Sequence, residues 1–215
     1  MDRNDTRFFP VFLGATLGVV LEEIATLVDE TVIGNISTDE AFAAVNLVEP
    51  YVYLEIFIGY LICVAAAAFI VRSHGAGDKN KMSELFSQTL IVCGIVGVAL
   101  TSIYVIFTPQ LIQLVADDPS VYDGALEYFS AMRFYPLVDL FDTFMFTYVL
   151  YRGGYVHFYV AIVCRISINA LLSWQLGLQM GLMGVGLASI ISIVVALIIK
   201  LTFLFGKKHG LKFRW

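Results

Sequence analysis

Two stretches of this sequence decide its fold: LIVCGIVGVALTSIYVIF (Leu90 to Phe107) and LMGVGLASIISIVVALII (Leu182 to Ile199). Neither contains a charged residue, and each approaches the length of about 20 apolar residues that a helix needs to cross a bilayer. A core helix of a soluble protein would present a charged face to water over this length. Both stretches therefore predict membrane-spanning helices.

The composition of the whole chain agrees with these two stretches. Of its 215 residues, 59% are apolar or aromatic and only 14% are charged, whereas a soluble domain carries roughly a quarter charged residues. We predict an all-α integral membrane protein with one domain, residues 1–215, and six transmembrane helices at about 9–34, 41–71, 84–108, 121–151, 156–177 and 182–206. Pro136 lies inside the fourth of these helices and should bend it.

The positive charges between these helices predict the orientation, because Lys and Arg accumulate in cytoplasmic loops. One set of loops and ends carries all of them: Arg3, Arg7, Arg72, Lys79, Lys81, Arg152, Lys207, Lys208, Lys212 and Arg214. The opposite loops carry acids instead: Asp39, Glu40, Asp117 and Asp118. We therefore expect both termini to be cytoplasmic.

Ionisable groups inside the predicted helices are costly and point to function by default. At about 1.5 Å per residue, one group of polar residues falls at a shared depth in the outer half: Asp29, Asn169, Ser173 and Ser189, with Glu49 at a similar level. A predicted charge network consists of Glu49 and a deeper group of four residues: Glu22, Glu23, Arg133 and Arg165. In this network we expect Glu22 or Glu23 to pair with an arginine.

Seven deep carboxyl groups against two arginines cannot all be neutralised by internal pairs. The acids are Glu22, Glu23, Asp29, Glu49, Glu55, Asp139 and Asp142. Because removal from water disfavours a charged carboxylate, this excess predicts a proton or small-cation site in a water-accessible cavity, with structural ion pairs and interfacial groups as the alternative. The histidines are isolated in loops and form no catalytic or metal motif, so we expect neither an enzyme nor a cofactor, and no nucleic acid partner.

Three segments together resemble the N-terminal six-helix lobe of multidrug and toxic compound extrusion (MATE) transporters. They are LVDETVIGNISTDEAFAAVNLVEP (27–50), IVRSHGAGDKNK (70–81) and INALLSWQLGLQMGLMGVGLASIIS (168–192). The first is similar to the end of that family's helix 1 and the start of its helix 2, and the second to an Arg-x-x-Gly-Ala-Gly-Asp loop. The third is similar to its Asn-rich helix 5 and the beginning of its helix 6.

The resemblance implies a proton or sodium site at four positions. Asp29 and Asn169 match the family's helix 1 aspartate and helix 5 asparagine, while Ser173 replaces a second aspartate and Ser189 replaces a threonine. Sodium, if it binds, would contact Asp29 and Asn169. The Ser173 replacement removes a charged oxygen that a hard cation would use, whereas Asp29 can still take up a proton.

The resemblance further implies a half-size secondary transporter of the plasma membrane, since family members have two such lobes with the substrate cavity between them. It would export organic, cationic small molecules in exchange for protons or sodium. Its partner in the bilayer would be a second six-helix lobe, supplied by a homodimer or by a separate chain. Two alternatives stay open: a non-transporting truncated membrane subunit and a lipid-handling membrane protein.

Overall fold

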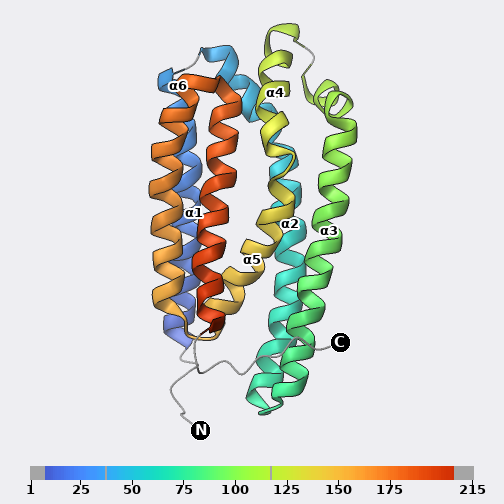
Figure 1. The fold of residues 1–215 in the computed structure, drawn as a ribbon, viewed down its shortest axis with the longest axis vertical. Helices are drawn as coiled ribbons and strands as arrows, with labels where there is room; N and C mark the ends of the chain where they lie inside the picture. The colour runs from blue at the N-terminus through green and yellow to red at the C-terminus, as the bar shows by residue number, and fades with distance from the viewer. Residues whose placement is uncertain (1–7, 37, 117, 206–215) are drawn as a thin grey trace.

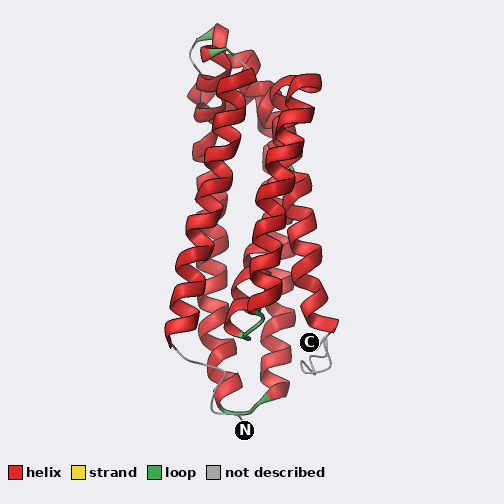
Figure 2. Cartoon of the chain, turned by 90° about the vertical axis from the view of Figure 1, so that its left-hand side faces the viewer, coloured by secondary structure: helices red, strands yellow, loops and turns green. Residues whose placement is uncertain are grey.

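The structure, a computed structural model, describes residues 8–36, 38–116 and 118–205, and within these residues it contains helices and no strand. The elements are α1 (Phe8–Ile36), α2 (Asp39–Gly75), α3 (Lys79–Val115), α4 (Pro119–Met132), α5 (Tyr135–Tyr151), α6 (Tyr155–Thr202) and a short 3-10 helix, η1 (Phe203–Phe205). They run side by side along the long axis of the molecule (Figure 2). Within the described residues, three helical segments are long and apolar enough to cross a membrane: Asp39–Gly75, Lys79–Val115 and Tyr155–Phe205.

The helices form two groups joined by a central pair. Figure 1 places α1 beside α6 and α2 beside α3, and α4 and α5 run between these groups. α1 packs extensively on α6 and only slightly on α2. α1 and α2 therefore border each other with little direct packing.

The segment α6 contains two helical legs that reverse direction at Gly181, as the orange and red parts of Figure 1 show. Gly181 has φ 61° and ψ −142°, a conformation that L side chains rarely adopt. Beyond the reversal the legs pack tightly, since a Cβ on Gly184 would lie 2.2 Å from the Leu176 carbonyl oxygen. The legs correspond to the separate helices predicted at 156–177 and 182–206.

The prediction of one continuous helix at 121–151 is wrong, because the structure divides this segment into α4 and α5 at Arg133 and Phe134. Pro136 lies in the first turn of α5, where its missing N–H has no helical partner to lose. In a continuous helix the proline ring would clash with the preceding turn. The bend expected at Pro136 is therefore a complete break.

Aspartates cap the N-termini of α3 and α4. Asp118 precedes α4, and its Oδ1 accepts hydrogen bonds from the backbone N–H and the hydroxyl of Ser120, at 2.9 and 2.8 Å. These bonds stabilise the carboxylate and lower the pKa of Asp118. Asp78 plays the same role before α3, where it accepts from the Lys81 N–H at 2.9 Å.

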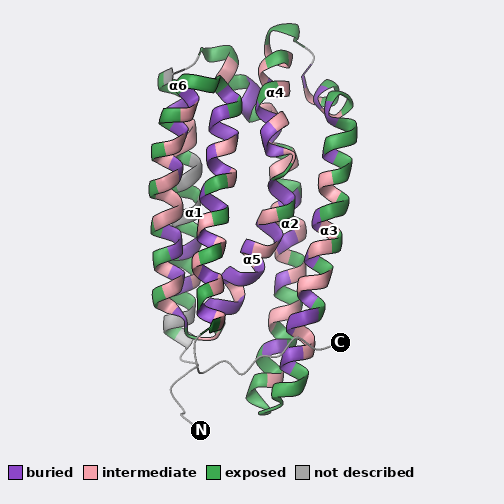
Figure 3. Cartoon of the chain, in the orientation of Figure 1, coloured by how far each residue is buried: buried purple, intermediate pink, exposed green. Residues whose placement is uncertain are grey.

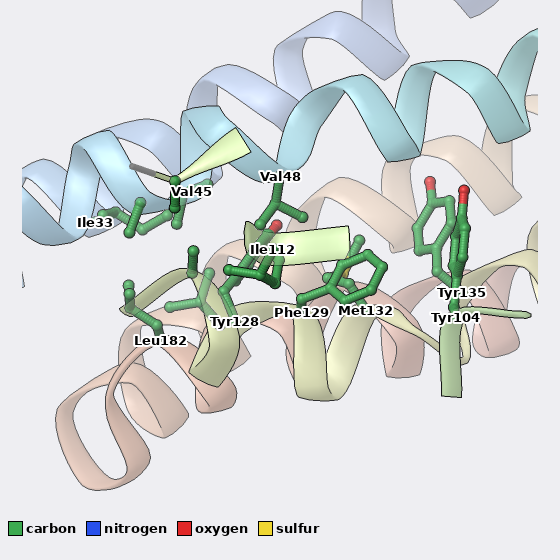
Figure 4. Close-up of a cluster of buried hydrophobic side chains, with 14 of the residues drawn as sticks. Ile33, Val45, Val48, Tyr104, Ile112, Tyr128, Phe129, Met132, Tyr135 and Leu182 are labelled. Atoms are coloured by element: carbon green, nitrogen blue, oxygen red, sulfur yellow. The ribbon is translucent and has the colours of Figure 1, made fainter. Parts of the chain in front are cut away.

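Two apolar clusters hold the helices together. One cluster, drawn in Figure 4, gathers side chains from all six α-helices, among them Ile33, Val48, Ile112, Phe129 and Leu182. The other lies around α5, which is buried along most of its length (Figure 3). Large apolar side chains also cover the outward helix faces, as expected where lipid replaces water.

Candidate cation and proton site

Asp29 on α1 accepts three side-chain hydrogen bonds. The Ser173 and Ser189 hydroxyls donate to its Oδ1 and Oδ2, each at 2.8 Å, and the Asn169 amide Nδ2 donates to Oδ2 at 3.2 Å. The four residues predicted from their shared depth and from the family resemblance therefore converge on one carboxyl group.

The reversal of α6 makes this convergence possible. Asn169 and Ser173 lie one turn apart on its first leg, and Ser189 lies on the returning leg. The Asn169 amide also donates to the Ser189 hydroxyl at 3.2 Å, which ties the legs together. All three side chains are buried, so their polar atoms depend on Asp29 and on one another.

Asp29, Asn169 and Ser189 line a cavity of about 280 Å³ between α1, α2, α4, α5 and α6. Glu49, predicted at a similar depth, and Glu23, from the predicted charge network, line the same cavity. Its wall also carries Glu30, Tyr53, Tyr60, Tyr128, Tyr135, Asp139, Thr143 and Arg165. The cavity thus combines several acids with aromatic rings and a single arginine among its described lining residues.

Arg165, predicted to pair with Glu22 or Glu23, lies 4.0 Å from Oδ2 of Asp142 and donates to the Tyr135 hydroxyl at 3.4 Å. The side chain of Glu22 lies outside the part of the chain that the structure describes, so the expected contact of Glu22 stays a prediction. Arg165 therefore has a carboxylate neighbour that the sequence interpretation did not name.

The other predicted arginine, Arg133, occupies the break between α4 and α5. Its guanidinium lies 5.2 Å from the centre of the Phe134 ring. Among the described residues, its buried Nε atom has no hydrogen-bond partner. Arg133 does not line the cavity that contains Asp29.

The sequence interpretation missed Lys200, which is buried and donates to Asp142 Oδ2 at 2.7 Å. This lysine follows the uncharged stretch 182–199 directly, a position from which lysines commonly extend to the membrane surface. Its only sequence signal was Asp142, an acid at membrane depth that required a cation. The sequence interpretation also named none of the tyrosines of the cavity wall as site residues, because aromatic residues in apolar helices have many packing roles.

Comparisons with known proteins place this arrangement in a family. The MatE family model matches residues 15–175. "Probable multidrug resistance protein YoeA" of Bacillus subtilis (strain 168) is 27% identical over 204 residues, which is 92% of this chain and 44% of that protein. The chain thus spans less than half the length of this curated relative.

Solved structures share the fold. A MOP superfamily transporter from Pyrococcus furiosus, described as having a binding pocket of reverse polarity, superposes with a TM-score of 0.84 at 21% identity, covering 94% of this chain and 45% of that one. A MATE crystal structure in the bent conformation gives a TM-score of 0.83 at 21% identity, covering 92% and 44%. The chain matches one half of each. By its match to the family model over most of its length, this multi-pass membrane protein belongs to the MatE family, whose members are transporters and not enzymes.

Proposed function

We propose that the chain is one six-span lobe of a secondary transporter of the plasma membrane, which pairs with a second lobe and exports organic cations in exchange for protons. The observation that carries this proposal is Asp29, the acceptor of three hydrogen bonds on the wall of the cavity. A carboxyl group beside a water-accessible cavity can take up and release a proton as the cavity opens to each side of the membrane.

The contacts of Asp29 support a proton more than sodium as the coupling ion. Its three neighbours donate hydrogen bonds to it, and Ser173 supplies no second charge. Sodium would replace these bonds with oxygen ligands and would find one carboxylate among the four residues. Asp29 and Asn169 remain the residues that sodium would contact, and the experiment below includes this ion.

The cavity wall supports a cationic, aromatic substrate. Glu23, Glu30 and Glu49 bring negative charge to it, and Tyr53 lies near Glu49. Carboxylates attract a cation over several ångströms, and tyrosine rings bind the face or the charge of an organic cation. Asp29 lines the same cavity, and its protonation would remove a further negative charge, which provides a physical link between proton uptake and release of the cation.

Two observations support a second lobe: the limited contact between α1 and α2, and the length of the relative, of which this chain covers less than half. α1 and α2 make limited contact beside the acidic wall, and lipid is a poor neighbour for several carboxylates. A second lobe covering this side would enclose them. Both termini being cytoplasmic, as the loop charges predict, would let a second copy of the chain insert in the same orientation and form a closed two-fold dimer.

The test is transport by the full chain in proteoliposomes with a pH gradient and ethidium as the organic cation. Wild type should move ethidium in the direction opposite to the flow of protons, and D29N should lose this coupling. E84Q is a matched control, because Glu84 lies outside the cavity beside Lys81. It should transport like wild type.

Cross-linking in native membranes, with the mass measured in nanodiscs, counts the lobes in each complex. A dimer without transport would favour the non-transporting subunit, and a transport-active monomer would contradict the need for a second lobe. Coupling that follows a sodium gradient in place of the pH gradient would assign sodium to the site. Unchanged coupling in D29N would remove Asp29 from the mechanism.

A further inference from the structure

Besides Asp29, two further carboxyl groups of the bundle, those of Glu55 and Asp139, lie next to each other. Glu55 on α2 is 0% exposed, and among the described residues neither of its oxygens has a hydrogen-bond partner. Asp139 on α5 is buried and accepts a hydrogen bond from the Thr143 hydroxyl at 3.2 Å. The two groups approach each other closely enough to interact, without reaching normal hydrogen-bond geometry.

The cations around this pair are too few to neutralise it. Lys200 is held by Asp142 at 2.7 Å, and Arg165 lies 4.0 Å from the same Asp142 oxygen. Arg165 also attracts Glu55 and Asp139. Two cations thus serve three buried carboxyl groups, even before Asp29 is counted.

Among the described residues, α3 brings no charged side chain to Glu55. From α3, Tyr104 faces Glu55, and its hydroxyl donates to the Tyr51 carbonyl oxygen at 2.8 Å. Because the neutral Tyr104 hydroxyl already donates its hydrogen bond to the backbone, it provides no hydrogen bond to the Glu55 carboxyl group. Two ionised carboxylates at this position would repel each other strongly, because little water screens them.

A proton can reach the pair through the cavity. Asp139 and Thr143 line the cavity that contains Asp29, while Glu55 interacts with Asp139 and is not among the lining residues. Asp139 therefore connects the water-accessible side with a carboxyl group that has no other partner. Neighbouring carboxyl groups in such a position titrate as a unit and share one proton.

We propose that Glu55 and Asp139 together hold one exchangeable proton, at a second protonation site separate from Asp29 in the same cavity. Glu55 supplies the group that cannot remain charged, and Asp139 supplies the route to water. Each lobe then has two groups that can hold a proton. One is Asp29, beside its serine and asparagine donors, and the other is the Glu55–Asp139 pair between α2 and α5. This second site would exist whether or not the chain transports a substrate.

The test is infrared spectroscopy of the full chain in nanodiscs at neutral pH, which detects the C=O stretching band of protonated carboxyl groups. Wild type and D29N should both show the band of the shared proton, and this band should shift in D₂O because the cavity admits water. E55Q should lose the band, since the two cations Arg165 and Lys200 then face two carboxylates, Asp139 and Asp142, and no proton is needed to balance them. D139N should keep a protonated Glu55 and move its band to a new frequency.

Thermal unfolding of each variant checks that the bundle is intact, and E84Q is the matched control that should leave the band unchanged. A band that is unaffected in both E55Q and D139N would overturn the proposal, as would a wild-type band that disappears only in D29N. If E55Q fails to fold, D139N still tests the proposal: a shifted band supports it, and an unchanged band contradicts it. Absence of export by wild type would contradict the transport proposal and leave this result untouched.

Discussion

Lys200 and Asp142 form a buried ion pair between the returning leg of α6 and α5, with Nζ 2.7 Å from Oδ2 and side-chain exposures of 1% and 2%. The ammonium group also lies 5.4 Å from the centre of the Phe146 ring. Asp142 has a second cation, Arg165, at 4.0 Å, and its Oδ1 has no hydrogen-bond partner among the described residues. This one carboxylate thus fixes the position of two cations inside the bundle.

Asp142→Asn should destabilise the protein more than Lys200→Met. The first change leaves the buried Lys200 without its partner, which costs about 3–5 kcal/mol. The second leaves Asp142 beside Arg165, and methionine fills the space of the lysine stem. Thermal unfolding of the detergent-solubilised variants compares them, and a K200M protein that is equally or less stable than D142N would contradict this view of the network.

Ser173→Asp should create a sodium-dependent site. The new carboxylate would lie where the Ser173 hydroxyl now donates to Asp29 at 2.8 Å, so two negative charges would face each other and attract a hard cation. We expect sodium chloride to raise the melting temperature of S173D above its value in choline chloride. Wild type and S173A are the controls, and an equal response of all three proteins to sodium would count against the prediction.

Gly181→Ala should disturb the reversal of α6. An alanine Cβ would lie 2.6 Å from Oε1 of Glu127, the oxygen that accepts a hydrogen bond from the Met183 N–H at 3.1 Å. The backbone conformation of Gly181, with φ 61° and ψ −142°, adds roughly 1–3 kcal/mol of strain for an L residue. We expect a lower unfolding temperature.

The matched control for that change is Gly34→Ala on α1, where φ is helical and a Cβ meets nothing within 4 Å. Alanine at such a helical position is favoured over glycine by roughly 0.5–1 kcal/mol. G34A should therefore be as stable as wild type or more so. If G181A matched G34A in stability, the reversal would not depend on glycine.

Glu49→Gln should weaken binding of an organic cation by about 1 kcal/mol, or about fivefold in Kd, because a half-buried carboxylate contributes a modest attraction. Ethidium fluorescence titration of the reconstituted protein measures the change. A neutral probe of similar size should bind both proteins equally. If ethidium binds E49Q and wild type alike, the acidic wall of the cavity does not select its charge.

The sequence by itself determined the class of the protein and the depth of its polar groups. Uncharged stretches such as Leu90 to Phe107 allow only a buried or membrane helix, and a fixed rise per residue converts sequence position into depth. The same arithmetic placed Asp29, Asn169, Ser173 and Ser189 at one level. These properties belong to single helices, so they require no knowledge of the neighbours.

The tertiary structure decided which groups at one level face each other. A helix turns by about 100° at each residue, so its rotation and crossing angles determine whether a side chain meets lipid or a partner. The close packing of the α6 legs brought Ser173 and Ser189 to Asp29, and the break before Pro136 set the direction of α5. Lys200 and Asp142 lie on different helices, and so do Glu55 and Asp139. The spacing of residues along one helix therefore cannot predict that these side chains meet.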